Sequence, residues 1–175
     1  MKNFLKSILS VFFYYDYQKY WTRRSALYST QTGKFRKKWY RLYISIINMK
    51  MGADIPVPQD HNIFETPPKD NNHGLLGIVI AGGTTIGKDC YISHQVTIGR
   101  SMNGVPTIGD NCYIGPGAKI FGKIKIGNNV RIGANCPVLF DVPDNATVVL
   151  PKPRVIIKDE GYEYYAYNAE KMKEE

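Results

Sequence analysis

The sequence predicts a mainly β protein, in which a solenoid of six-residue repeats follows an N-terminal helical segment. Isoleucine returns every six residues in the second half of the chain, a smaller residue usually stands two positions before it, and glycine often follows it. Six is a multiple of the strand period of two and not of the helical period of 3.6, so these side chains share one face only in extended structure. The row consists of Ile80, Ile86, Ile92, Ile98, Ile108, Ile114, Ile120, Ile126 and Ile132, and Val138 closes it.

Each hexad is expected to form one flat face and one turn. Hexads from Ile78 to Pro143 make roughly three to four triangular coils, and a stack needs at least about three repeats to bury its core. The glycines that follow the isoleucines are expected to permit the unusual backbone angles of a tight corner. Cys90, Cys112 and Cys136 all fall on the small inward position, so we expect free thiols that serve packing.

The chain divides into four expected segments. Residues 1–51 lack proline and form two helices joined near residues 30–34. Residues 52–77, rich in Pro, Asp and Asn, form an irregular segment or an imperfect first coil. Residues 78–150 form the hexapeptide-repeat β-helix. Residues 151–175 supply a final edge strand, continuing from 148–150 through 155–157, and a charged tail.

The two N-terminal helices have different expected roles. The second carries a broad apolar side opposite its cations and is expected to cover the open end of the solenoid. That side comprises Trp39, Leu42, Tyr43, Ile44, Ile47 and Met51. The first packs on the solenoid or on a partner subunit, or else residues 2–13 lie on a membrane surface. This run is too short to span a bilayer and no cleavage site follows it, so we expect a cytoplasmic protein, with peripheral contact at the inner face of the membrane as the alternative.

The net charge of +8 indicates an anionic partner, either a phosphate-bearing cofactor or a membrane surface. Nucleic acid is not expected, because the chain has no RNA-binding or helix-turn-helix motif. One irregularity also points to function. The isoleucine spacing grows from six to ten between Ile98 and Ile108, so four residues within 100–105 should leave the stack as a loop.

The repeats and four further stretches resemble the left-handed β-helix acyltransferases, and among them most closely serine acetyltransferase. These stretches are 77–80, 96–99, 114–122 and 130–143, which hold Gly-Ile-Val-Ile, Val-Thr-Ile-Gly, Ile-Gly-Pro-Gly-Ala-Lys-Ile-Phe-Gly and a final segment ending Asp-Val-Pro. The resemblance implies a left-handed parallel β-helix, a homotrimer and acetyl-CoA as the acyl donor, with no metal. The short N-terminal part also resembles the short relatives associated with surface polysaccharide synthesis.

The resemblance also implies roles for particular residues. His73 matches the general base of the family, and Asp54, in an Asp-Ile pair, matches the acidic residue that orients it. His73 stands one residue further from Ile78 than the family pattern has it, so either the imidazole faces away or a bulge absorbs the extra residue. His94 is the substitute base, and His61 is expected to be a surface residue.

Acetyl-CoA is expected at a glycine-rich corner formed by Gly115, Gly117, Ala118 and Lys119. Glycines should leave backbone N–H groups open to a pantetheine arm or an oxyanion, and Lys119 should meet a phosphate. The chain reads Gly104-Val105-Pro106 where the serine enzymes have Arg-His before proline. The acceptor is therefore either L-serine or a saccharide hydroxyl.

Two alternative functions stay open at this point. A γ-type carbonic anhydrase uses the same solenoid and binds zinc through three histidines, and this chain has three, although their spacing does not match such a site. A membrane-associated scaffold would use the solenoid only for trimerisation. We favour an O-acetyltransferase, because the hexads together with the four matching stretches are specific to the acyltransferase family that the chain resembles.

Overall fold

The computed structural model describes residues 15–57 and 62–158. Two helices, α2 (Tyr17–Ala26) and α3 (Lys34–Lys50), come before a series of short strands. The strands are β1 (Val79–Ile80), β2 (Thr85–Ile86), β3 (Tyr91–Ile92), β4 (Thr97–Gly99), β5 (Thr107–Ile108), β6 (Tyr113–Ile114), β7 (Lys119–Phe121), β8 (Lys125–Ile126), β9 (Arg131–Ile132), β10 (Pro137–Val138) and β11 (Thr147–Val148).

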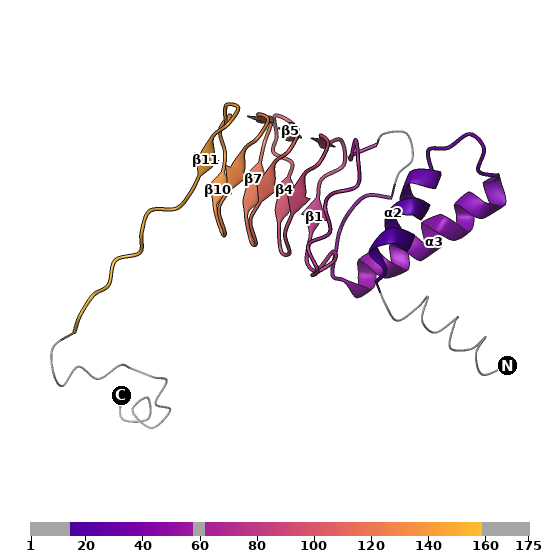
Figure 1. The fold of residues 1–175 in the computed structure, drawn as a ribbon, viewed down its shortest axis with the longest axis horizontal. Helices are drawn as coiled ribbons and strands as arrows, with labels where there is room; N and C mark the ends of the chain where they lie inside the picture. Colours follow the sequence, from indigo (N-terminus) through magenta and orange to yellow (C-terminus); the bar gives the residue numbers. More distant parts are fainter. Residues whose placement is uncertain (1–14, 58–61, 159–175) are drawn as a thin grey trace, which may run out of the picture.

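The strands form three parallel sheets that wrap around one core (Figure 1). Their orders are β1-β4-β7-β10, β2-β5-β8 and β11-β9-β6-β3, so each strand pairs with the strand one full coil away. Isoleucine aligns with isoleucine in this register, as in Ile80 with Ile98 and Ile98 with Ile120. The prediction of a mainly β parallel β-helix behind N-terminal helices is confirmed.

The predicted inward row is the core. Every isoleucine of the row, and Val138 after it, is at most 3% exposed. The three cysteines are free thiols and at most 2% exposed, as their position in the hexad predicted. The hexad pattern therefore identified the interior correctly.

The glycines after the isoleucines have a different role from the one predicted. Gly87, Gly109 and Gly127 are absent from the residues with positive φ, so they do not supply unusual backbone angles. A Cβ on Gly109 would instead lie 2.8 Å from the carbonyl carbon of Gly127 in the next coil. These glycines are required because successive coils approach closely at that position.

Polar residues supply the left-handed backbone angles at one corner of the solenoid. Asp89, Asn111, Asn129 and Asn145 all have φ between 52° and 60°. Asn111 Nδ2 donates to Asn129 Oδ1 at 2.9 Å, and Asn129 Nδ2 donates to Asn145 Oδ1 at 3.0 Å. Asparagine tolerates the left-handed region better than most residues, and here its amide also links one coil to the next.

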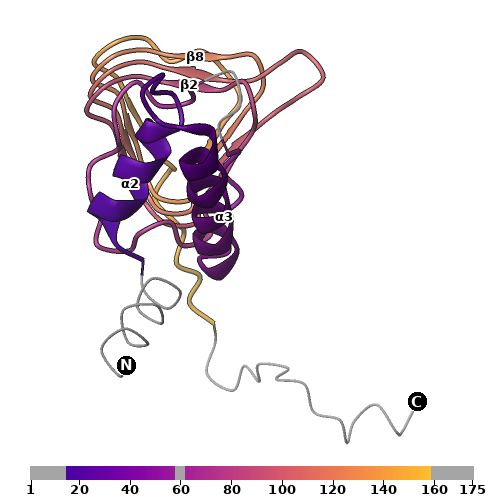
Figure 2. The same ribbon diagram turned by 90° about the vertical axis from the view of Figure 1, so that its right-hand side faces the viewer.

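The segment between α3 and β1 contacts all three sheets. Asp54 bridges to Val79, Phe64 to Ile86, and Lys69 to Tyr91, each in parallel. The chain therefore circles the core once before the regular coils begin. The two helices pack on this segment and lie across the N-terminal end of the solenoid (Figure 2).

Buried polar contacts fix the helices to that segment. Tyr20 Oη donates to Asn48 Oδ1 at 2.8 Å, and Asn48 Nδ2 donates to the Ile55 carbonyl at 2.8 Å. Arg24 Nη2 donates to the Pro56 carbonyl at 2.7 Å. Because each of these donors or acceptors is removed from water, the contacts define one orientation of the helices.

The predicted apolar side of α3 is divided between two faces. Tyr43, Ile44 and Ile47 are buried, but Trp39 is 55% and Leu42 49% exposed. The helix therefore covers the end of the solenoid with only part of its apolar side. One side of the helix packs inward, and a second group of apolar side chains faces away from the core.

The end of the solenoid also differs from the prediction. β11 is the last strand of the described chain, and residues 151–158 contain none, so the edge strand expected at 155–157 is not formed. Pro151 and Pro153 lack the N–H groups that a strand would use for pairing. Residues 2–13, the start of the expected first helix and the possible membrane contact, lie outside the described residues together with the tail beyond 158, whereas α2 and α3 join near the expected residues 30–34. Within the described residues, no helix combines the length and hydrophobicity needed to cross a membrane.

Candidate functional site

The candidate site lies at one corner of the solenoid, where the first coil is enlarged. Lys69 and Val79 pair with Tyr91 and Thr97 of the next coil. Ten positions separate the first two residues and only six separate their partners, so the first coil has four additional residues at this corner. The resulting loop contains His73. The direction in which the His73 side chain points is therefore decided by the loop and not by the alternation of a strand.

Asn71 holds the His73 loop against the next coil. Its side chain is buried, with Nδ2 donating to the Ile92 carbonyl at 2.6 Å and Oδ1 accepting the His73 backbone N–H at 3.0 Å. Asn72, between them, has a φ of 58°. This is an Asx-type turn, in which a side-chain oxygen replaces a backbone acceptor.

The turn brings two predicted residues together. The His73 and His94 rings contact each other, with centroids 4.7 Å apart and planes tilted by 62°. His94 occupies the corresponding corner of the next coil, between β3 and β4, and its Nδ1 lies 3.4 Å from Ser93 Oγ. The His73 side chain is exposed and the His94 side chain is half-buried. Both rings therefore have surface that a bound molecule can reach.

Lys119 lies in the third coil at the same corner. Its ammonium donates to the Gln95 carbonyl and to Thr97 Oγ1, both at 3.0 Å. The Gly117 N–H donates to the His94 carbonyl at 3.1 Å. His73, His94 and Lys119 thus come from three consecutive coils at the same corner of the solenoid. Lys119 stays exposed and has one ammonium proton left for a ligand.

The backbone donors expected at the glycine-rich corner are already in use. Within the chain, the N–H groups of Gly115, Gly117 and Ala118 donate to the carbonyls of Ile132, His94 and Gly115. The Lys119 N–H donates to Cys136, and the Ala118 side chain is fully buried. The prediction that these N–H groups are open was wrong, because hydrogen bonds between coils, and for Ala118 a turn within its own coil, already occupy them. A ligand at this corner would meet the Lys119 ammonium.

The Asp54 carboxylate is not linked to the two imidazoles by hydrogen bonds. Its backbone pairs with Ile78 and Ile80, and its exposed side chain lies in register with Val79. Within residues 15–57 and 62–158, no hydrogen bond or ion pair joins Asp54 to either histidine. The expected contact between Asp54 and His73 is not formed within this chain.

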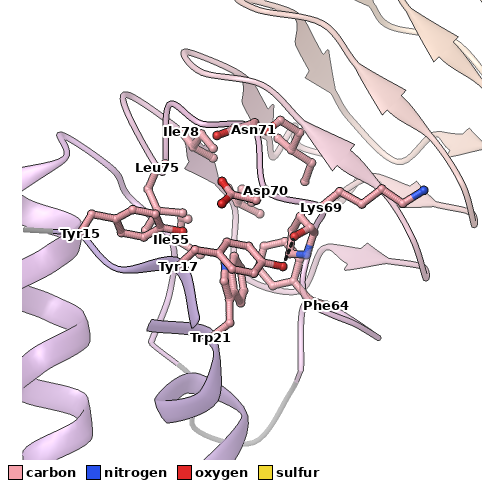
Figure 3. Close-up of a pocket in the computed structure, with 14 residues that line it drawn as sticks. Tyr15, Tyr17, Trp21, Ile55, Phe64, Lys69, Asp70, Asn71, Leu75 and Ile78 are labelled. Carbon is pink, nitrogen blue, oxygen red and sulfur yellow. Dashed lines mark hydrogen bonds between the residues drawn. The ribbon is translucent and has the colours of Figure 1, made fainter. Parts of the chain in front are cut away.

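A small, mainly apolar pocket lies between α2 and the first coil, next to the His73 loop (Figure 3). Tyr15, Tyr17 and Trp21 line it on the side of the helix, and Asp70 and Asn71 line it on the side of the loop. Tyr17 Oη donates to the Pro68 carbonyl at 2.7 Å. Burial raises the pKa of Tyr15, so its phenol stays protonated. These contacts make α2 a support for the loop.

The described residues contain no group of three or more His, Cys, Asp or Glu side chains arranged to hold a metal ion. His61, the third histidine of the zinc alternative, lies outside the described residues. The residues that sequence analysis missed are Asn71, Gln95 and Thr97, which position the loop and Lys119. The consecutive asparagines before His73 are a turn signal that could have revealed Asn71.

Comparison with known proteins identifies the repeat. Residues 106–136 match the bacterial transferase hexapeptide (six repeats) model. The hexapeptide-repeat prediction is thereby confirmed for this stretch. The chain is also similar to the serine acetyltransferase of Helicobacter pylori strain J99, with 45% identity over 92 residues that cover 50% of this chain and 53% of the relative.

Solved serine acetyltransferases share the fold. The chain is similar to isoform 3 from Entamoeba histolytica in complex with cysteine, with 32% identity and a TM-score of 0.57, covering 70% of this chain and 44% of that one. It is also similar to a serine acetyltransferase in complex with CoA, with 29% identity and a TM-score of 0.55, covering 79% of this chain and 56% of that one. The chain thus spans about half the length of the relatives that it matches.

Proposed function

We propose that the protein is an acetyl-CoA-dependent O-acetyltransferase of the serine acetyltransferase type. Its acceptor is a hydroxyl group of L-serine or of a saccharide. The observation that supports this most directly is the pair of histidines beside Lys119, at an enlarged corner of a hexapeptide solenoid. The similarity to serine acetyltransferases over half of the chain supports the same activity.

His73 is the proposed general base. Its ring is exposed, so an acceptor hydroxyl can approach it, and a neutral imidazole nitrogen can accept a proton. It takes the proton from the acceptor hydroxyl while that oxygen attacks the thioester carbonyl. The C–S bond then breaks, and the imidazolium returns the proton to the departing thiolate. A second imidazole in contact can hold the first in a productive orientation, so we propose that His94 positions His73.

The donor is proposed to lie along the surface that contains Lys119. A related enzyme has been solved with CoA, and CoA carries phosphates that an ammonium group can bind. Gln95 and Thr97 fix the Lys119 side chain before any ligand arrives, which lowers the entropic cost of using it. Gly115, Gly117 and Ala118 would then shape the surface through their close packing.

Asp54 is proposed to complete the site only in an assembly. The family resemblance implies a homotrimer with sites between subunits. The Asp54 carboxylate is exposed and forms no side-chain hydrogen bond or ion pair with residues 15–57 or 62–158, which suits a contact across such an interface. Light scattering of the purified protein would test the trimer. An Asp54→Asn variant that retains full activity would remove the residue from the site.

The activity itself can be tested by following CoA thiol release from acetyl-CoA with L-serine, sugars and nucleotide sugars as acceptors. The protein's own thiols should add little signal to this assay, because its three cysteines are buried. We expect release with one acceptor class and its loss in His73→Ala. Thr85→Ala, on the exposed face of β2, is a control that should retain activity. Absence of release with every acceptor would contradict the proposal.

A further inference from the structure

The exposed side of α3 forms an apolar stripe that nothing in the described chain covers. Phe35, Trp39, Leu42, Ile46 and Met49 recur in steps of four and three residues, which places them along one side of the helix. Phe35 is 76% and Met49 is 75% exposed. The ring centroids of Phe35 and Trp39 lie 6.3 Å apart.

This stripe is separate from the face that packs on the protein. The inward face holds Tyr43, Ile44, Ile47 and Asn48, all of which are buried. At about 100° per residue, the stripe lies on the far side of the helix from Ile44. Figure 1 places α3 beyond the coils at the N-terminal end of the solenoid, and Figure 2 shows it lying across that end.

Cations border the stripe. Lys34, Lys38 and Arg41 follow one edge and Arg36 the other, and all four are exposed. Helix α3 contains no acidic residue. Across residues 15–57 and 62–158, none of these four cations forms an ion pair with a carboxylate.

The charge pattern favours an anionic occupant. The six acidic residues of 159–175 are the alternative within this chain, and stronger vesicle binding after their removal would assign the stripe to that segment. A second copy of α3 would bring like charges together, which opposes pairing of this face with itself. Residues 1–15 contain no Asp or Glu, so that segment offers these cations no carboxylate. An anionic surface with an apolar interior satisfies both features, because Trp and Phe insert at the interface while Lys and Arg meet lipid phosphates.

We propose that the exposed stripe of α3 docks on an anionic lipid bilayer surface. The helix lies in the plane of the interface, and the β-helix extends away from it. Because α3 lies at the end of the solenoid and the histidine pair belongs to a corner of the coils, docking does not require the candidate site to enter the bilayer. This proposal does not depend on the proposed acetyltransferase activity.

The two tryptophans provide a direct measurement. Trp21 is 5% exposed and Trp39 is 55% exposed. Adding vesicles of phosphatidylcholine mixed with phosphatidylglycerol to the full-length protein should shift the Trp39 emission to shorter wavelength, whereas phosphatidylcholine alone should do so much less. Trp39→Phe should remove the shift while the protein still sediments with the mixed vesicles.

Sedimentation with the mixed vesicles tests the surface itself. Replacing two cations in Lys38→Glu/Arg41→Glu should reduce partitioning more than about tenfold, since each cation near an anionic surface contributes about fivefold. Phe35→Gln/Met49→Gln should also reduce it about tenfold. Leu139→Gln/Phe140→Gln replaces a similarly exposed apolar pair at the opposite end of the solenoid and should change nothing.

Three results would overturn the proposal. The first is no vesicle binding by the parent protein. The second is vesicle binding that all the α3 variants retain without a Trp39 shift, since the contact then lies elsewhere in the chain. The third is a change of oligomeric state in Phe35→Gln/Met49→Gln by light scattering, which would assign the stripe to a subunit interface. Circular dichroism of each variant checks that the fold is intact.

Discussion

The imidazole of His73 contacts that of His94, with ring centroids 4.7 Å apart. His73 reaches this position because four additional residues enlarge the first coil and Asn71 ties the loop to Ile92. The contact defines the candidate site more sharply than either histidine alone. It also makes the roles of the two rings separable by substitution.

Replacing each histidine should give different losses of activity. His73→Ala should lower kcat by about a hundredfold to ten-thousandfold, since it removes the proposed base. His94→Ala should lower it less, because the base remains but loses its neighbour. Steady-state kinetics of both variants at saturating acetyl-CoA measures the two losses in kcat. If instead His94→Ala abolishes turnover and His73→Ala is tolerated, then His94 is the base.

Lys119 should affect the donor more than the chemical step. Lys119→Ala should raise KM for acetyl-CoA about tenfold with little change in kcat, since a hydrogen bond to a charged group contributes about 1.5–3 kcal/mol. Lys125→Ala is the matched control, because Lys125 is exposed on β8, in a different sheet. Steady-state kinetics with varied acetyl-CoA measures both. An equal rise in KM for acetyl-CoA in both variants would mean that the donor responds to net positive charge and not to the position of Lys119.

The sequence predicted the fold well because the hexad period is a property of neighbouring residues in extended structure. The hexad period also identified correctly the isoleucines and cysteines that face the interior. It could not separate the two faces of α3, because Tyr43 and Leu42 are both apolar and only packing decides which one is buried. It also assigned Gly109 a backbone role, whereas the constraint comes from Gly127 one coil away. The His73–His94 contact was likewise hidden, because it depends on how a four-residue insertion folds.

Asn129 should stabilise the solenoid through its backbone angle as well as its amide. Its φ is 57°, and its side chain connects Asn111 to Asn145. Asn129→Ala should cost about 1 kcal/mol more than Asn129→Gly, because alanine is strained in the left-handed region and glycine is not. Both variants lose the amide ladder, so their difference isolates the strain. Urea unfolding followed by circular dichroism measures it, and equal stabilities would attribute the effect of the residue to the ladder alone.

Cys90 should make the fold sensitive to alkaline pH. The neighbouring Cys112 thiol and burial raise the pKa of Cys90 in the folded protein, whereas an exposed thiol in the unfolded chain ionises near ~8.5. The hydrogen bond with Cys90 lowers the pKa of Cys112 to about 7, so well above pH ~8.5 Cys112 is ionised in both states and only Cys90 keeps its proton in the folded state. In that range the unfolded state binds fewer protons than the folded state, so the free energy of unfolding falls as pH rises. The expected slope from this one group is about 1.4 kcal/mol per pH unit.

Urea unfolding in a thiol reductant, between about pH 8 and pH 10, tests this effect across the range in which a free thiol ionises. Cys90→Ala should make the pH dependence shallower. The small cavity that it leaves lowers stability at every pH and therefore does not alter the slope. An unchanged slope in Cys90→Ala would show that other groups, such as the buried Tyr20, whose pKa is raised by burial, account for the alkaline loss.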